Sequence, residues 1–581
     1  MSLTFAEDFP GMTTQANTTL KTIVEAQRQH DYPELPTDKY FEIFSSQQVL
    51  KKLRFNPDPD EIAGGLLGGD GDAGVDGFYV YCNKKLIRDE GDVQFFKGQK
   101  AEIEIVVVQA KNKPSFEEAV PMKFKDFVEN ALGPDCPTSS ATTLYSQELL
   151  DHVARFRLLY KLVLPLKPTL SATFFHAAHS DVVDTKVEER GRILCQCFRQ
   201  VFPTANASYM PITGTDLVKL SQKSIPRTLP LKTPKYFDYT SFDRGAYACV
   251  VNLKDFYDFI SDEGEIRDHL FEANVRDYAP DATVNQGIEQ TLANPEGDDF
   301  WWLNNGITIL AADAYYASGN LQVTDPLIVN GLQTSHVVFR HFKGGADPND
   351  SRSMMVKVIV NSNEATSDKI IRATNSQTKI SSIFLHATEQ VHRDIELHLK
   401  AAGYFYDRRK NYYRNQGKSV SEIVTIHYLA QAVASIVLQQ PDDARVRPGT
   451  VAEKNYKKLF SDKYPPALYT KCVQIMRRCH TYLRGKGLGK TDVLNLVFYL
   501  AMYVTCAACN SVSPKRNKIA SLDVDAISDK IFDQCYKWID AEFKALGGDD
   551  RVAKGPNLTT SLNQKVISQF GGAKGKHGKG K

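Results

Sequence analysis

Alternating and helical patterns of apolar residues divide the chain into zones. Between about 41 and 230, strand-like runs such as GFYVYCN, IEIVVVQA and TLSATFFHAAH are separated by amphipathic helical runs such as YSQELLDHVARFRLLYKLVL. A stretch rich in lysine and proline at 221–239 then breaks the periodicity and predicts a linker. Further strands follow, among them ACVVNL, GITILAA and SMMVKVIV, and beyond about 420 the pattern is mostly helical.

These zones predict an α/β multidomain chain. A length of 581 residues agrees with two to four domains, because one hydrophobic core rarely serves so long a chain. We expect a helical lead-in at 1–40, an α/β domain at 41–230, a mixed α/β domain at 240–420, a mainly helical C-terminal region at 421–550 and a basic disordered tail at 551–581.

Composition narrows the class of protein without naming a partner. With 42% hydrophobic and 24% charged residues, the chain is typical of globular proteins, and its net charge of +2 leaves room only for a local basic groove. The N-terminus shows no basic start before an apolar stretch, so we expect a cytoplasmic chain with no membrane partner. Cys506 and Cys509 lie in an apolar helical run without further ligands nearby, which predicts buried thiols.

A glycine-rich acidic turn, GGDGDAGVDG at 68–77, leads into a strand. A calcium loop that began at Asp70 would need a glutamate at its twelfth position, where Tyr81 stands. A phosphate-binding P-loop is excluded because no Gly-Lys-Ser/Thr follows the glycines. The later GLGKT at 487–491 also fails, since Arg484 occupies the place of the first glycine.

A partner for this turn comes from the strand EIEIVVVQAKNK at 102–113. Both of its faces are apolar, which predicts a central strand covered on each side. Gln109 and Lys111 share one face at its C-terminal end, and we expect Asp76, at the entry to a neighbouring strand, to meet them there. Carboxylate and amide oxygens suit Mg²⁺ or Mn²⁺, and a lysine can orient water or neutralise a phosphate. The alternative is a structural salt bridge.

Asp76 followed by Gln109-x-Lys111 resembles the PD-(D/E)XK nuclease signature in its Q-x-K form, similar to Mrr-type restriction endonucleases. The resemblance implies a restriction-endonuclease-like α/β fold and a Mg²⁺-dependent endonuclease with Asp76, Gln109, Lys111 and Glu61 as catalytic residues. Of these, Asp76, Gln109 and Glu61 would hold the metal. The turn here has Ala73 in place of one glycine, and an amide replaces the usual acid at 109, which leaves the number of metals open.

The segment from 271 to 418 is rich in amide side chains, which suit recognition of hydrogen-bonding ligands but also cap turns. Several of its short motifs contain the residues Asn274, Arg276, Trp302, Asn304, Asn305, Gly306, Asn330, Gly331, Gln333, Thr334, Asn375 and Gln377. In these residues and their order the segment resembles the abortive infection phage resistance (AIPR) family. As ligand-binding candidates we take Arg276, Asn304, Asn305, Asn330, Gln333, Asn375 and Gln377.

Basic and aromatic residues alternate soon afterwards. Aromatic faces can stack on bases while cationic groups meet phosphates. The alternative is a solvated turn whose tyrosines pack on the core. The candidate nucleic-acid contacts are Arg408, Arg409, Lys410, Tyr412 and Tyr413.

The resemblances together imply a metal-dependent nuclease effector of bacterial antiphage defence, hydrolysing phosphodiester bonds in nucleic acid under control of the AIPR domain. We expect DNA rather than RNA as the substrate, a homodimer, and a nucleotide or phage-derived molecule as the trigger. Two alternatives stay open: a non-catalytic nucleic-acid-binding module, and a nucleotide-sensing switch whose working site is the amide-rich domain.

Overall fold

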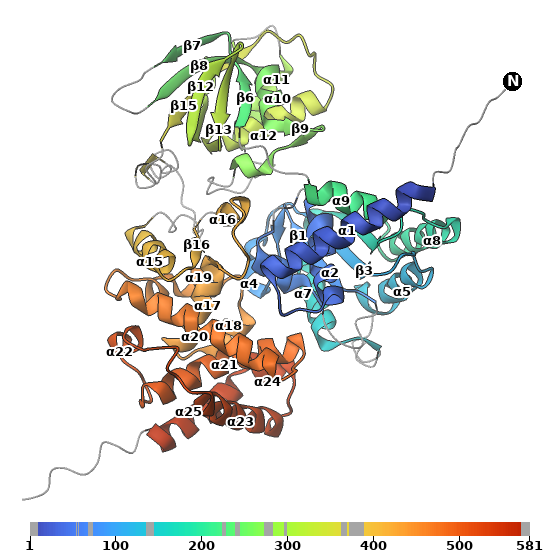
Figure 1. Cartoon of the computed structure of the whole chain (residues 1–581). Coiled ribbons are helices and arrows are strands. Elements are labelled where there is room, and N and C mark those ends of the chain that lie inside the picture. The colour runs from blue at the N-terminus through green and yellow to red at the C-terminus, as the bar shows by residue number, and fades with distance from the viewer. Residues whose placement is uncertain are drawn as a thin grey trace, which may run out of the picture. The chain divides into compact units, whose positions relative to one another are not determined.

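The computed structural model describes residues 10–53, 55, 57–67, 74–134, 144–222, 228–238, 245–271, 283–294, 299–361, 366, 369–370, 389–408 and 410–570 (Figure 1). The protein is mixed α/β, with several sheets in its N-terminal half and a mostly helical C-terminal region. This agrees with the fold class expected from the sequence.

The chain packs as two compact units. The first comprises Met1–Lys223, Arg393–Asp407 and Asn411–Lys581, and the second comprises Ser224–His392 and Arg408–Lys410. The C-terminal helices therefore share a unit with the N-terminal α/β region, although the whole second unit separates them in sequence. The finer domain boundaries expected above stay predictions.

A five-stranded mixed sheet forms the centre of the N-terminal region. β1 pairs antiparallel with β2 and β3, whereas β3, β4 and β5 run parallel. β3 is the middle strand, as its two apolar faces predicted. In order across the sheet the strands are β2 (Lys85–Leu86), β1 (Gly77–Cys82), β3 (Glu102–Lys111), β4 (Thr169–Ala178) and β5 (Asn206–Ile212).

Helices cover both faces of this sheet. Ile105 and Val107 point into one apolar core and Val106 and Val108 into another, all at most 1% exposed. Burying each such side chain contributes roughly 1.5–3 kcal/mol. The first core is closed by α4 (Glu90–Phe95), α5 (Ala119–Phe127), the π-helix η1 (Val128–Leu132), α7 (Gln147–Val163), continued by the short 3₁₀ turn η2 (Leu164–Leu166), and α8 (Thr185–Val201); the second is closed by α1 (Pro10–Asp31), α2 (Thr37–Lys52), α3 (Pro59–Gly65) and α9 (Gly214–Gln222).

The C-terminal part of the first unit is a set of helices around α21 (Lys490–Ala508), with one short parallel pair of strands. The others are α15 (Gln390–Ala401), β16 (Phe405–Asp407), α16 (Tyr412–Asn415), β17 (Ile423–Thr425), α17 (Ile426–Ile436), α18 (Pro441–Val446), α19 (Val451–Leu459), α20 (Pro466–Gly485), α22 (Arg516–Ala520), α23 (Asp529–Ala545), α24 (Asp550–Lys554) and α25 (Pro556–Phe570).

α21 is apolar on all sides. In the described part of the chain it is the one helix long and apolar enough to cross a membrane by length and composition, with a mean hydropathy of 1.4, and 72% of that stretch is buried inside the fold. Cys506 and Cys509 are buried thiols, as predicted.

The second unit is built on two sheets with one shared core. In the larger sheet β11 and β15 are parallel and the other pairs antiparallel. Its strands are β14 (Leu327–Asn330), β11 (Ile307–Ala311), β15 (Ser353–Val360), β8 (Ala246–Asn252) and β7 (Lys235–Asp238); the smaller has β12 (Asp313–Ala317), β13 (Asn320–Thr324) and β6 (Thr228–Lys232). The remaining elements are α10 (Leu253–Ile260), β9 (Ser261–Asp262), β10 (Glu265–Ile266), the 3₁₀ turn η3 (Asp268–Phe271), α11 (Thr283–Ala293) and α12 (Leu332–Lys343).

Two segments differ from the sequence prediction. The expected linker at 221–239 contains β6 and β7, because Leu229 and Leu231 alternate with exposed residues and fill the core, and β6 is an edge strand, where proline is tolerated. The expected disordered tail from 551 begins with α24 and α25. Leu558, Leu562 and Val566 recur every four residues and are buried, which makes α25 an amphipathic helix.

Replacing Leu562 with alanine should therefore lower the free energy of unfolding by roughly 2–5 kcal/mol, because it empties a fully buried leucine site. Ile567, on the same helix, is 56% exposed, and its alanine variant should cost less than about 0.5 kcal/mol. Urea denaturation followed by circular dichroism measures both. Equal, negligible effects would show that α25 does not pack on the unit.

Candidate functional site

The acidic turn and the central strand meet through Asp76. Because Gly77 pairs with Val108 in the antiparallel ladder, Asp76 stands opposite Gln109. Its carboxylate oxygen Oδ2 accepts hydrogen bonds from Gln109 Nε2 at 3.2 Å and from the backbone N–H of Ala110 at 2.7 Å. Both side chains are buried, with Asp76 6% and Gln109 0% exposed. The sequence prediction that these two residues converge is thus confirmed.

Gly74 makes room for this pair. Its φ of 72° lies in the left-handed region, and a Cβ atom there would sit 2.6 Å from Gln109 Oε1. Gln109 Oε1 itself is buried and has no hydrogen-bond partner among the described residues. The amide therefore presents an unused acceptor beside the carboxylate that orients it.

Lys111 is at the end of the same face of β3 and is partly exposed. In the described part of the chain it forms no ion pair with Asp76. Its charge acts instead on Glu117 and on His176, which is buried on β4. The alternative of a structural salt bridge between Lys111 and Asp76 is thus not found among the described residues, and the expected approach of the lysine to Asp76 stays a prediction.

His176, on β4, lies next to Gln109 and was not predicted from the sequence as a site residue. It pairs in register with Gln109, is 0% exposed, and its Nδ1 lies 3.0 Å from the Tyr209 hydroxyl. Burial lowers the pKa of His176 to about 4, with Glu117 opposing and Lys111 adding to the shift. The imidazole is therefore neutral at physiological pH. The signal was present in the sequence, since parallel strands end at one edge and His176 continues the apolar face of β4.

Glu61 is not brought to Asp76. It belongs to α3, where its carboxylate accepts the backbone N–H of Asp58 at 2.9 Å in a reciprocal capping box. Burial raises the pKa of Tyr81, the fifth residue of β1, and the charge of Glu61 adds to that shift. The structure thus gives Glu61 a helix-capping role.

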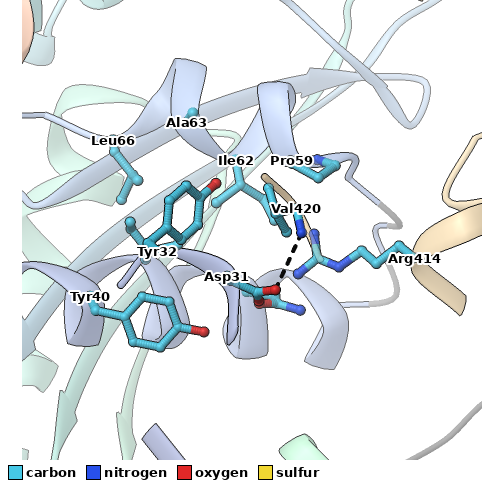
Figure 2. A pocket seen from close by; sticks show the side chains of 11 residues that line it. Asp31, Tyr32, Tyr40, Pro59, Ile62, Ala63, Leu66, Arg414 and Val420 are labelled. Carbon is cyan, nitrogen blue, oxygen red and sulfur yellow. Dashed lines mark hydrogen bonds between the residues drawn. The ribbon is translucent and has the colours of Figure 1, made fainter. Parts of the chain in front are cut away.

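A small cavity of about 20 Å³ adjoins α3. Figure 2 shows Ile62 and Ala63 on its wall together with Arg414 and Val420 from the C-terminal part of the same unit. The backbone N–H of Val420 donates to Asp31 at 3.3 Å. The cavity therefore lies where the C-terminal part meets the helices that cover the sheet, and it does not include the Asp76 site.

The oxygen atoms of Asp76 and Gln109 are of the type that a hard divalent ion prefers. Among the described residues no group of three or more His, Cys, Asp or Glu side chains could hold a metal. Mg²⁺ does not require one, because it keeps several waters and binds one or two carboxylates plus substrate phosphates. A carboxylate beside the buried, unpartnered Gln109 Oε1 supplies oxygen donors of that kind.

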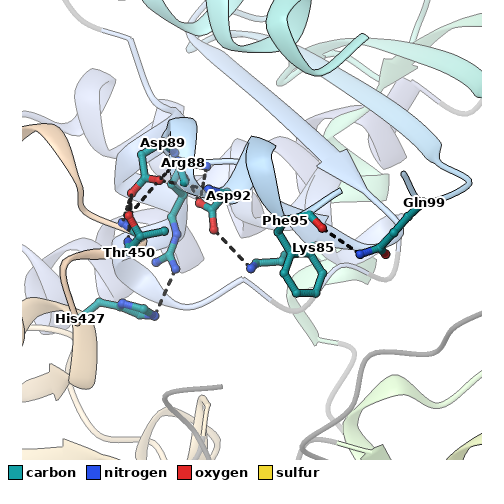
Figure 3. Close-up of polar contacts among 10 residues, drawn as sticks. Lys85, Arg88, Asp89, Asp92, Phe95, Gln99, His427 and Thr450 are labelled. Atoms are coloured by element: carbon teal, nitrogen blue, oxygen red, sulfur yellow. Dashed lines mark hydrogen bonds and ion pairs between the residues drawn. The ribbon is translucent and has the colours of Figure 1, made fainter. Parts of the chain in front are cut away.

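The C-terminal helices are attached to the α/β region by a buried carboxylate, Asp89 (Figure 3). Asp89 caps α4 by accepting from Gly91 at 2.8 Å, and it also accepts from the backbone N–H of Thr450 at 2.9 Å and of Gly449 at 3.1 Å. Beside it, Arg88 Nη2 lies 3.1 Å from His427 Nε2. Such charge-assisted bonds are among the stronger hydrogen bonds in proteins.

In the second unit, two of the amide-rich segments meet at one edge. Thr308, in β11, pairs with Asn330, the last residue of β14, and the Thr334 hydroxyl donates to Asn304 Oδ1 at 3.2 Å. Gly331, with a φ of 101°, could not accept a side chain, since a Cβ there would lie 2.2 Å from Ile307. The structure thus gathers Asn304, Asn305, Asn330, Gln333 and Thr334 in this region. Arg276, Asn375 and Gln377 lie outside the described residues, as does Asn274.

An exposed apolar group precedes this edge: Trp301 is 42%, Trp302 68% and Leu303 61% exposed. Contiguous exposed apolar surface is a feature of binding sites, whereas single exposed side chains are ordinary. Asn305, two residues after Leu303, is also exposed. Aromatic and amide groups are thus presented side by side along the sequence.

The basic and aromatic segment is largely part of the fold. Tyr413 is 7% exposed, and its hydroxyl donates to Glu396 at 2.7 Å. Arg408 is also buried, whereas Tyr412 and Lys410 are partly exposed, and Arg409 lies outside the described residues. Their contact with nucleic acid stays a prediction.

Residues 271–542 match the family model described as AIPR protein. No curated protein and no solved structure matches the chain. The comparisons give no support for the expected PD-(D/E)XK domain, which stays a prediction.

Directly before Arg408, in the basic and aromatic segment, lies a carboxyl group that should make the stability of the fold depend on pH. Asp407 is 4% exposed and accepts the backbone N–H of Tyr413 at 3.0 Å. Burial raises the pKa of Asp407 from 3.8 to about 7, against the opposing effect of the backbone N–H groups. The folded state thus holds a proton that the unfolded chain releases, so stability should fall as pH rises from about 4 to about 7.

Asp407→Asn keeps an oxygen acceptor for Tyr413 but cannot titrate. In this variant the loss of unfolding free energy between pH 4 and pH 7 should therefore be smaller by on the order of a few kcal/mol. Urea midpoints of both proteins across pH 4 to 8 measure this. Parallel curves would contradict the raised pKa.

Proposed function

From an AIPR family domain at residues 271–542, of a family associated with abortive infection and phage resistance, we propose that the chain is a metal-dependent nuclease effector of bacterial antiphage defence. The observation that supports the nuclease is the meeting of Asp76 with Gln109 at the strand edge where Lys111 also emerges. On this proposal, the AIPR domain controls a hydrolytic centre that lies in the N-terminal α/β region.

The fold around these residues agrees with a restriction-endonuclease-like domain. A mixed sheet, covered by helices on both faces, places the aspartate at the start of one strand and the Gln-x-Lys pair at the end of its antiparallel neighbour. Because the two strands are paired in register, the carboxylate and amide meet without any loop rearrangement. The meeting of these two side chains supports the proposal of a hydrolytic site.

Each residue then has a distinct role in phosphodiester hydrolysis. A bound Mg²⁺ or Mn²⁺ would polarise the phosphate and lower the pKa of a bound water. Asp76 and Gln109 would hold that ion, with the Ala110 N–H fixing the carboxylate. Lys111 would orient the attacking water or neutralise charge on the phosphate oxygens. DNA rather than RNA as substrate, a homodimer, a cytoplasmic location and a nucleotide or phage-derived trigger belong to the same proposal.

The purified chain should cut plasmid or linear nucleic acid only with Mg²⁺ or Mn²⁺, and Asp76→Asn and Lys111→Ala should each lower the cleavage rate at least 100-fold. Lys113→Ala is the control, because it removes an exposed positive charge on the segment that follows the same strand. It should keep the catalytic rate. Circular dichroism confirms folding. Retained cleavage of DNA and RNA by both site variants would refute the assignment.

A second candidate function is nucleotide sensing at the amide-rich edge. It is favoured by the exposure of both Trp302 and Asn305, three residues apart, since an aromatic face can stack on a base and an amide can bond its edge. On this view the second unit holds the working site, and the α/β region responds to it.

Calorimetry against a panel of nucleotides tests this candidate. Trp302→Ala and Asn305→Ala should each weaken binding at least tenfold, whereas Tyr315→Ala, which removes another exposed aromatic ring of the same unit, should not. Binding that is absent from the wild type, or equal in all three variants, would exclude the site.

A further inference from the structure

α21 begins with a lysine that is bound to the α/β region. Lys490 Nζ donates to the backbone carbonyl of Leu66 and lies 3.6 Å from Glu148 Oε1, on the first turn of α7. The Lys490 side chain is 31% exposed and that of Glu148 12%. The GLGKT sequence that does not qualify as a P-loop thus has a structural use, which is to join α21 to two segments of the N-terminal region.

The same carboxylate receives a second donor. The Thr491 hydroxyl donates to Glu148 Oε2 at 2.8 Å. Burial lowers the pKa of Lys490, and the charge of Glu148 opposes that shift. Lys490 and Thr491 therefore both bind the Glu148 carboxylate, and this carboxylate keeps the Lys490 ammonium next to the Leu66 carbonyl.

Leu66 stands at one flank of the turn that carries Asp76. The N–H of the next residue, Leu67, donates to the Asp76 carbonyl at 2.8 Å, and Leu66 forms a β-bridge with Gly77. The Asp76 N–H in turn donates to Val108 of the central strand at 2.8 Å. Lys490 thus binds Leu66, the residue next to Leu67, and the Leu67 N–H forms the hydrogen bond that fixes the Asp76 carbonyl.

We propose that Lys490 and Glu148 are positioning residues for Asp76. This inference rests on the proposed function and adds its control: α21 lies within the stretch matched by the AIPR family, so docking of that helix holds the hydrolytic carboxylate in register. Displacement of a catalytic group by about 1 Å can cost on the order of 100-fold in rate. If the start of α21 detaches, Asp76 should shift and hydrolysis should stop, although no residue of the site itself has changed.

A second lysine, Lys554, forms a comparable ion pair with α7 but is not bound to Leu66 in the described part of the chain. Lys554 also joins the C-terminal helices to α7, where its ammonium lies 2.5 Å from Asp151. Asp151 is on the same helix as Glu148, but among the described residues Lys554 pairs with Asp151 and Asp550 and not with the Leu66 segment. Lys490→Met and Lys554→Met each remove one ion pair between the same two regions, and only the first is next to Asp76.

Hydrogen–deuterium exchange on the full-length chain tests the positioning directly. In Lys490→Met the amides of Leu67 and Asp76 should exchange at least tenfold faster than in the wild type, and Lys490→Arg should restore most of the protection. Lys554→Met should leave these amides unchanged. If Lys490→Met protects them as well as the wild type does, or if both methionine variants loosen them equally, the positioning role is refuted.

Cleavage kinetics with Mn²⁺ supply the functional half of the test. Lys490→Met should lower kcat at least tenfold with KM for the nucleic acid changed less than threefold, and Lys554→Met should alter neither. A wild type that does not cleave would refute the proposed nuclease, while the exchange data would still decide whether Lys490 holds the Asp76 backbone. Normal kcat in a variant with loosened amides would refute the link to catalysis.

Discussion

The site depends on a buried carboxylate that is held by donors from the neighbouring strand. Asp76 accepts from the side chain of Gln109 and from the backbone of Ala110, at 3.2 and 2.7 Å. A buried carboxylate without such partners would be costly, so the register of β1 against β3 and the position of Asp76 stabilise each other. A slip of one residue in that register would turn Gln109 away from Asp76.

The sequence predicted the sheet well because its strands have clear patterns. Two apolar faces on β3 could only mean a strand covered on both sides, and the two helical layers fulfil that requirement. The role of Glu61 was harder to predict, because Asp58-x-x-Glu61 also has the spacing of a capping box. In the structure Glu61 forms that capping box with Asp58. His176 was overlooked because its signal, a histidine on the apolar face of β4, gains meaning only once β4 is known to pair in parallel with β3.

Contacts between distant parts of the chain could not be predicted from periodicity. Asp89 and Thr450, or Leu66 and Lys490, are separated by more than 350 residues, with the second unit between them. The expected tail and linker failed for a related reason, since a few buried leucines in a polar context decide whether a segment folds. These long-range contacts are also what joins part of the AIPR region to the α/β sheet.

The most direct test of the proposed site measures metal binding without any substrate. Isothermal calorimetry with Mn²⁺ should detect an ion on the wild-type chain, and Asp76→Asn and Gln109→Leu should each abolish or weaken that binding at least tenfold. Glu61→Gln should bind as the wild type does, because the Glu61 carboxylate caps α3 by accepting the Asp58 N–H. Equal binding by the wild type and the Asp76 variant would show that the oxygen pair at the strand edge does not hold a divalent ion.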